Sequence, residues 1–360
     1  MTSVGNRATR GEELIYLFFV LWTMIGLCLD GWAHRYQPEL ESFFTPWHAV
    51  FYTGFIFGTL ALARMVIRRR PTSPSLRASI PEGYGLAVLG LGLFGLAGVG
   101  DGFWHTIFGV ETGIDALLSP THLLLLIGML AGATAPVRAA WRNPQLTVFD
   151  TGLSSLVPTV LAIAVSTTGV AFFFLYANGF SNWQLQRSYV VNSSEALISS
   201  GIFSTLASTV ILLGPVMLIL RRWKTPFWFF TIVFGIVGVF MAGLDAFQYW
   251  WQVIPPVVGG LTVDAIIRWQ ALDGFASGSD NMAPDTERTE AHLRRRAWAV
   301  GAITPLVMWS VSTLAINAWW DVAWPPELWV GQIIMAALVG LGLGVISHPP
   351  SAPASLPVEA

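Results

Sequence analysis

Two stretches of the chain each contain one aspartate and two histidines in the same order. The first set is Asp30, His34 and His48, and the second is Asp101, His105 and His122. Four of the six histidines in the chain belong to these sets. Imidazole nitrogen and carboxylate oxygen are donors that suit copper, zinc or non-haem iron, and three ligands leave coordination positions for water or a substrate. The pattern predicts two metal sites.

The spacing within each set indicates which elements must position the ligands. The aspartate and the first histidine are four residues apart, so a helix places both on one face. The second histidine follows Thr45-Pro46 in one set and Ser119-Pro120 in the other. Because Ser and Thr are favoured N-caps and Pro is favoured at the first helical position, we expect this histidine in the first turn of the next helix. The alternative is that these side chains are solvated residues at helix ends.

The composition indicates an integral membrane protein. Hydrophobic residues make up 54% of the chain and charged residues 11%, whereas a soluble domain carries about 25% charged residues. The net charge is −2 and Lys224 is the one lysine, so the pattern gives no basic surface for nucleic acid. Cys28 is the single cysteine, which excludes an internal disulfide, and a packing role is favoured for it over a role as a metal ligand. The lipid bilayer is therefore the expected partner, in a cell (inner) membrane.

Apolar segments long enough to span a bilayer predict about ten transmembrane helices, and hence an all-α integral membrane protein. They pair as five hairpins with extracytoplasmic loops. The predicted spans are 14–34, 46–67, 83–107, 120–141, 151–177, 195–220, 226–250, 254–271, 298–320 and 326–346. The domain organisation follows: a cytoplasmic N-terminus (1–13), two hairpins with the metal motifs (14–141), three further hairpins (142–346) with a cytoplasmic linker at 272–297, and a disordered tail (347–360). Because the first apolar run continues into the first motif, we expect no cleaved signal peptide.

The arginines predict the orientation of these hairpins. Basic residues gather before the first span, after the second, fourth and sixth spans, and between the eighth and ninth. The opposite loops contain only Arg35 and Arg187. By the positive-inside rule both termini are cytoplasmic, and both metal motifs are on the extracytoplasmic side.

Other residues near the predicted outer ends of the spans are candidates for supporting the site or contacting a substrate. They are Trp32, Trp104, Glu195, Asp245, Asp321 and Glu327. The two tryptophans adjoin predicted ligands, although most tryptophans here suit an interfacial belt. The two glutamates begin returning helices, where a capping role is favoured. For the two aspartates an interfacial position is an equal alternative.

The motifs resemble those of the C subunit of the particulate methane and ammonia monooxygenase family. Asp101-Gly102-Phe103-Trp104-His105 with Ser119-Pro120-Thr121-His122 is the better match, and Phe44-Thr45-Pro46-Trp47-His48 matches the Pro-x-His half. The resemblance covers roughly residues 14–140. It implies copper at one or both sites, with the two Asp/His/His sets as ligands. The sequence differs from the family in beginning both motifs with Asp, and in having three further hairpins and no cupredoxin-like domain.

Three function classes remain at this point. The first is a copper-dependent membrane monooxygenase, or its metal-bearing subunit, that oxidises a small apolar substrate with dioxygen and has additional subunits for electron supply or oligomerisation. The second is a membrane metal-handling protein, such as a copper or zinc acceptor or permease, without redox chemistry. It predicts polar residues deep in the spans, and these are few. The third is a scaffold whose motifs are caps and interfacial anchors.

Overall fold

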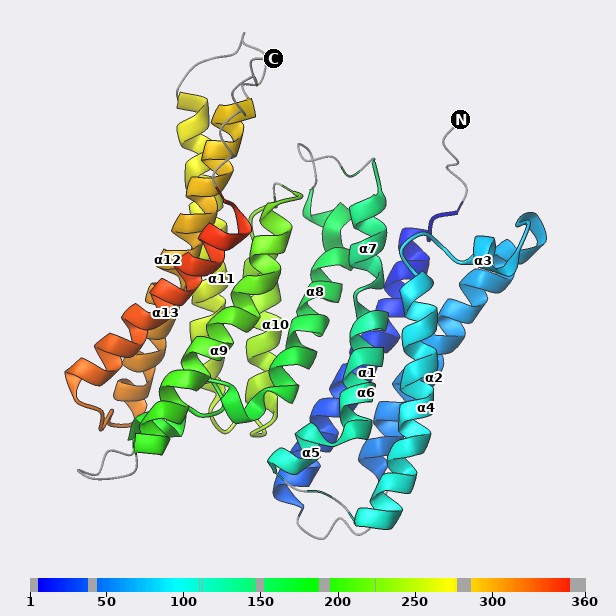
Figure 1. The fold of residues 1–360 in the computed structure, drawn as a ribbon, viewed down its shortest axis with the longest axis horizontal. Coiled ribbons are helices and arrows are strands. Elements are labelled where there is room, and N and C mark those ends of the chain that lie inside the picture. Colours follow the sequence, from blue (N-terminus) through cyan, green and yellow to red (C-terminus); the bar gives the residue numbers. More distant parts are fainter. Residues whose placement is uncertain are drawn as a thin grey trace, which may run out of the picture.

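A computed structural model describes residues 6–37, 44–109, 111, 113–144, 146, 152–187, 195–223, 225–276 and 286–349, which form helices joined by turns and loops (Figure 1). The longer helices are α1 (Arg10–Tyr36), α2 (Pro46–Arg69), α4 (Gly85–Phe108), α6 (Pro120–Ala133), α8 (Leu153–Phe173), α9 (Glu195–Leu220), α10 (Phe229–Gly243), α11 (Ile254–Ala276), α12 (Thr286–Trp319) and α13 (Pro326–Ser347). Three shorter α-helices are α3 (Leu76–Ser79), α5 (Ile114–Leu118) and α7 (Ala135–Arg142). The all-helical prediction is confirmed.

The helix lengths are those of a multi-pass membrane protein. Among the described residues, nine helices are long and apolar enough to cross a bilayer, with α6 and α7 together forming one of them. The seventh predicted span, 226–250, is not among these nine, because α10 has only 15 residues. Trp228 has a left-handed backbone (φ 78°) where α10 begins, and left-handed Ala246 and Phe247 turn the chain after it ends. These conformations stop the helix on both sides.

Neighbouring helices pack as hairpins in four of the five predicted cases. These pairs are α1 with α2, α4 with α6, α10 with α11, and α12 with α13. The third pair differs: α8 packs chiefly against α10, and α9 against α13. The third hairpin is therefore splayed. In the chain that follows α8, Asn178 and Trp183 are buried.

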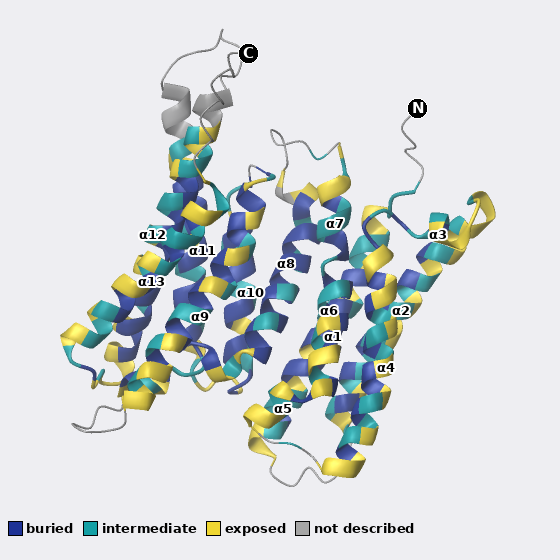
Figure 2. Ribbon diagram, in the orientation of Figure 1, coloured by how far each residue is buried: buried dark blue, intermediate teal, exposed yellow. Residues whose placement is uncertain are grey.

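Helix α8 joins the four helices that carry the metal motifs to the remaining five. It contacts α1 and α6 on one side and α10 on the other. Its most apolar stretch is 83% buried, against 28–56% for the other spans, and its dark colour stands out in Figure 2. The start of α1 and the end of α13 lie toward one end of the molecule, and the motif loops lie at the other (Figure 1).

Glycines let the motif helices approach closely enough to share ligands. A Cβ on Gly26 of α1 would lie 2.4 Å from the Cα of Phe51 in α2, and one on Gly54 would lie 2.5 Å from the backbone nitrogen of Thr23. Such small residues allow backbone-to-backbone packing in membrane helices. The register of α1 on α2 is thereby fixed just below the first motif.

Part of the predicted linker at 272–297 is helical. α11 continues to Ala276 and α12 begins at Thr286, while 277–285 lies outside the described residues. The polar start of α12 is rich in Glu, Arg and Ala, which are good helix formers, so the helix extends beyond its apolar part. Of the predicted tail, residues 350–360 also lie outside the described part.

Candidate metal centre

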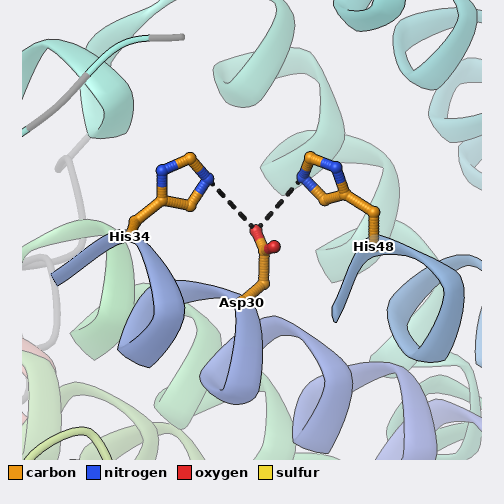
Figure 3. A group of neighbouring side chains, drawn as sticks. All are labelled: Asp30, His34 and His48. Carbon is orange, nitrogen blue, oxygen red and sulfur yellow. Dashed lines mark ion pairs between the residues drawn. The ribbon is translucent and has the colours of Figure 1, made fainter. Parts of the chain in front are cut away.

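The first triad joins the end of α1 to the start of α2. Both imidazoles turn their Nε2 atoms toward the same carboxylate oxygen (Figure 3). Asp30 Oδ2 lies 3.7 Å from Nε2 of His34 and 3.3 Å from Nε2 of His48. Asp30 and His34 share one face of α1 at the predicted spacing of four residues, and the α1–α2 packing brings His48 opposite them.

The second triad repeats this arrangement between α4 and α6. Asp101 Oδ2 lies 3.6 Å from Nε2 of His105, and Asp101 Oδ1 lies 3.2 Å from Nε2 of His122. Asp101 is 1% exposed. Its Oδ1 also accepts a hydrogen bond of 2.8 Å from the hydroxyl of Thr121. A carboxylate this deeply buried needs partners of opposite charge or hydrogen-bond donors.

The predicted helix starts place the second histidine of each triad as expected. In α2, Pro46 is the first helical residue and the Thr45 hydroxyl accepts a hydrogen bond of 3.1 Å from the backbone N–H of His48. In α6, Pro120 is likewise first, but Ser119 makes no such cap. Its hydroxyl lies instead 2.8 Å from Nδ1 of His122. The same sequence signal therefore serves as a cap in one hairpin and as a ligand support in the other.

Backbone carbonyls set the tautomer of the second pair of imidazoles. Nδ1 of His105 lies 3.2 Å from the carbonyl oxygen of Gly109, and Nδ1 of His122 contacts that of Ala116. Since a carbonyl oxygen can only accept, each Nδ1 carries a proton, and each Nε2 faces Asp101. This is the orientation that metal-bound histidines take when a carbonyl holds the other ring nitrogen.

The donor sets fit a metal ion in chemistry and in size. The ligand atoms of each triad all lie within 4.8 Å of one another. The imidazole–carboxylate distances are 3.3 and 3.7 Å in one triad and 3.2 and 3.6 Å in the other. With bonds of about 2.1 Å, neighbouring donors in a tetrahedral site lie about 3.4 Å apart. A lone pair facing a carboxylate needs a cation between them, either a metal ion or a proton on the imidazole.

The two triads adjoin one another. The ring centroids of His48 and His105 are 6.4 Å apart, although the two residues belong to different hairpins. A cavity of about 30 Å³ is lined by one aspartate and one histidine from each triad, Asp30 and His48 with Asp101 and His122. Its other walls are apolar and include Phe51, Phe94, Leu125, Met129 and Phe173. Four of the six candidate ligands, one from each of four helices, thus line one small space.

Of the tryptophans next to ligands, Trp104 is linked to the second triad. Its indole N–H donates a hydrogen bond of 2.6 Å to Oε1 of Glu111, and Oε2 of Glu111 lies 3.9 Å from Nδ1 of His122. Trp32 instead packs against Trp47, with ring centroids 5.6 Å apart. Sequence reasoning did not select Glu111 or Thr121. The signals for them were a carboxylate in the loop between the two histidines and a hydroxyl beside His122.

The acidic candidates of the later hairpins lie outside both triads. Asp245, at the end of α10, is buried and forms an ion pair of 2.9 Å with Arg35 and a hydrogen bond of 2.9 Å with the hydroxyl of Tyr36. It therefore holds the end of α1, directly after His34. The remaining three are exposed at helix ends or in a loop of the other bundle; they are Glu195, Asp321 and Glu327. Cys28 is buried among apolar side chains, as its predicted packing role requires.

Asp264, inside a span, has a structural role. It accepts hydrogen bonds from the backbone N–H groups of Phe230 and Thr231 and from the Thr231 hydroxyl. A carboxylate from α11 thus caps the start of α10.

Comparison of the chain with protein-family models, with curated proteins and with solved structures found no match. Functional assignment accordingly depends on the two triads.

Proposed function

We propose that this protein holds two copper ions in the adjoining triads and takes part in the oxidation of a small apolar substrate with dioxygen. The observation that carries the proposal is a pair of adjoining Asp/His/His triads, in which two carboxylates and two of the four imidazoles, from four helices, line one small cavity. Nitrogen-rich donor sets with open positions suit copper, and the motif resemblance to the methane and ammonia monooxygenase C subunit favours it over zinc or iron.

Each group in the centre has a physical task in this proposal. The four histidines would hold the metal through Nε2, and Asp30 and Asp101 would offset its charge. The carbonyls of Gly109 and Ala116 orient two of the rings. Phe51, Phe94 and the other apolar walls exclude water from the cavity. Copper bound there supplies one-electron redox chemistry and a position for dioxygen.

The stoichiometry of oxygen insertion requires a source of electrons. Insertion of one oxygen atom into a C–H bond leaves the second atom to be reduced to water, which takes two electrons and two protons. We propose that further subunits supply these electrons. With the arginine distribution as support, we also propose that the triads face the extracytoplasmic side.

The metal-handling alternative needs a polar path through the membrane. Apolar side chains line much of the cavity, among them Leu125, Leu126 and Met129. A charged ion would lose its hydration there without replacement ligands. This apolar lining favours a resident metal over a transported one.

Copper and zinc loading of the purified protein tests the proposal. Protein stripped of metal and reloaded with copper is expected to show electron paramagnetic resonance with nitrogen hyperfine structure. Liposomes containing the protein are expected to retain a copper gradient. Preference for zinc without a copper signal, or copper flux that disappears in His34→Ala and His105→Ala, would contradict the proposal and support metal handling.

A further inference from the structure

A large apolar groove lies on the outside of the metal-motif helices, between α2 and α4. Its volume is about 540 Å³. α2 packs closely on α1 and α4 on α6, whereas α2 and α4 contact each other little, which leaves the groove open. Ile56, Val99 and Phe103 are among its lining residues, and the last two are 64% and 67% exposed. In a membrane helix such an exposed apolar rim faces lipid.

Glycines of α4 make the floor of the groove. Gly95, Gly98 and Gly102 all line it, three or four residues apart on one face. A Cβ on Gly95 would meet only Phe55, at 3.4 Å, so this position is open space toward the groove. On Gly98 a Cβ would lie 2.8 Å from Cε1 of Tyr52, so the Tyr52 ring rests directly on the α4 backbone.

Tyr52 separates the groove from the metal centre. It lines the groove and also lines the cavity that Asp30, His48 and Asp101 share. Its ring lies edge-on to the ring of His48, with centroids 6.1 Å apart. One partly buried side chain of α2 therefore forms the wall between a lipid-facing apolar groove and the buried ligands.

We propose that this groove admits a small, uncharged apolar molecule from the bilayer to the metal centre, with Tyr52 as the gate. The occupant follows from size and chemistry. The groove has the volume of a small-molecule pocket. Among the described residues that line it, none is charged, and only Tyr52 and Thr106 supply hydroxyls. The inner cavity of about 30 Å³ accepts only a molecule of a few heavy atoms. The inference depends on the proposed function for its purpose, although not for its test.

Contact of dioxygen with Tyr52 can be measured without any metal. Metal-free protein with 3-fluorotyrosine is placed in lipid nanodiscs, and the Tyr52 resonance is assigned from the Tyr52→Phe variant. Dioxygen dissolved in the bilayer is expected to enhance the fluorine relaxation of Tyr52 strongly. Gly95→Leu fills the groove and is expected to reduce this enhancement several-fold. Gly92→Leu, on the same helix at a position with nothing within 4 Å and outside the groove, is the control and should leave it unchanged.

A second pair of variants protects the test against misfolding. Val99→Trp blocks the rim of the groove, whereas Leu96→Trp places the same ring on an exposed position outside it. Equal dioxygen contact in the Gly95 and Val99 variants and in their controls would overturn the proposal. A lipid with a nitroxide on its acyl chain gives the other outcome that would overturn the proposal. If it relaxed the Tyr52 fluorine more strongly than dioxygen does, a lipid would be the occupant of the groove. Because the samples contain no metal, these results can be interpreted even if the copper proposal fails.

Discussion

His48 and His105 belong to separate helical hairpins, and yet their imidazole centroids lie 6.4 Å apart. Each is also a member of an aspartate-centred triad, so the two triads adjoin one another. A substitution in one triad should therefore alter the properties of metal bound in the other. This coupling distinguishes a joint centre from two independent binding sites.

Copper bound to both triads is expected to be magnetically coupled. Fully loaded protein should give a broadened electron paramagnetic resonance spectrum with less signal than its copper content. The His34→Ala variant keeps one complete triad and should give a sharper, mononuclear spectrum. Spin counting against metal analysis makes the comparison. A wild-type spectrum equal to the sum of two independent mononuclear signals would show that the triads do not share a centre.

Thr121 is expected to strengthen metal binding by the second triad. Its hydroxyl donates a hydrogen bond to Asp101, and loss of such a support typically lowers metal affinity about 10- to 100-fold. Thr121→Val should weaken one of the two copper equivalents while the stoichiometry at saturating metal stays the same. Thr59→Val is the matched control, because the Thr59 hydroxyl donates its hydrogen bond to a carbonyl of its own helix, that of Phe55. Competition titration with a copper chelator measures both. Equal affinities in the two variants would remove Thr121 from the centre.

The spacing of a few residues was enough to predict which side chains form the triads. Asp-x3-His fixes a helical face, and Pro-x-His fixes a first turn, so both are local rules that tertiary packing did not override. The adjacency of the triads was harder to predict, because it depends on how α2 lies beside α4. The splayed third hairpin was missed for the same reason. Glu111 and Thr121 act through geometry that only the folded loop and helix start provide.

Arg35 and Asp245 are expected to stabilise the junction between the metal-motif helices and the rest of the molecule. Asp245 is 3% exposed at its side chain and Arg35 is 46% exposed. Arg35→Ala leaves a buried carboxylate without its guanidinium, which costs on the order of 1–3 kcal/mol after allowing for the exposure of the arginine. Arg35→Lys should cost less. Unfolding by sodium dodecyl sulfate in mixed micelles gives the free energies, and an unchanged midpoint for Arg35→Ala would contradict the role.

Close packing of α1 on α2 is expected to be necessary for the first triad. Gly26→Ala places a methyl group 2.4 Å from Cα of Phe51, so the helices must separate and His48 moves from Asp30. We expect lower stability by about 1–3 kcal/mol and loss of metal from this triad. Gly11→Ala, in the same helix with nothing within 4 Å, should change neither property. Normal copper content in the Gly26 variant would show that the triad does not need this contact.

The copper content of purified protein after reconstitution tests the central claim most directly. The account predicts about two copper ions per chain in the wild type and in His292→Ala, whose side chain lies outside both triads. It predicts about one in His34→Ala and in His105→Ala, and none in the double variant. Wild-type protein that retains no stoichiometric metal, or a double variant that still binds two ions, would contradict the assignment of these six residues as the metal centre.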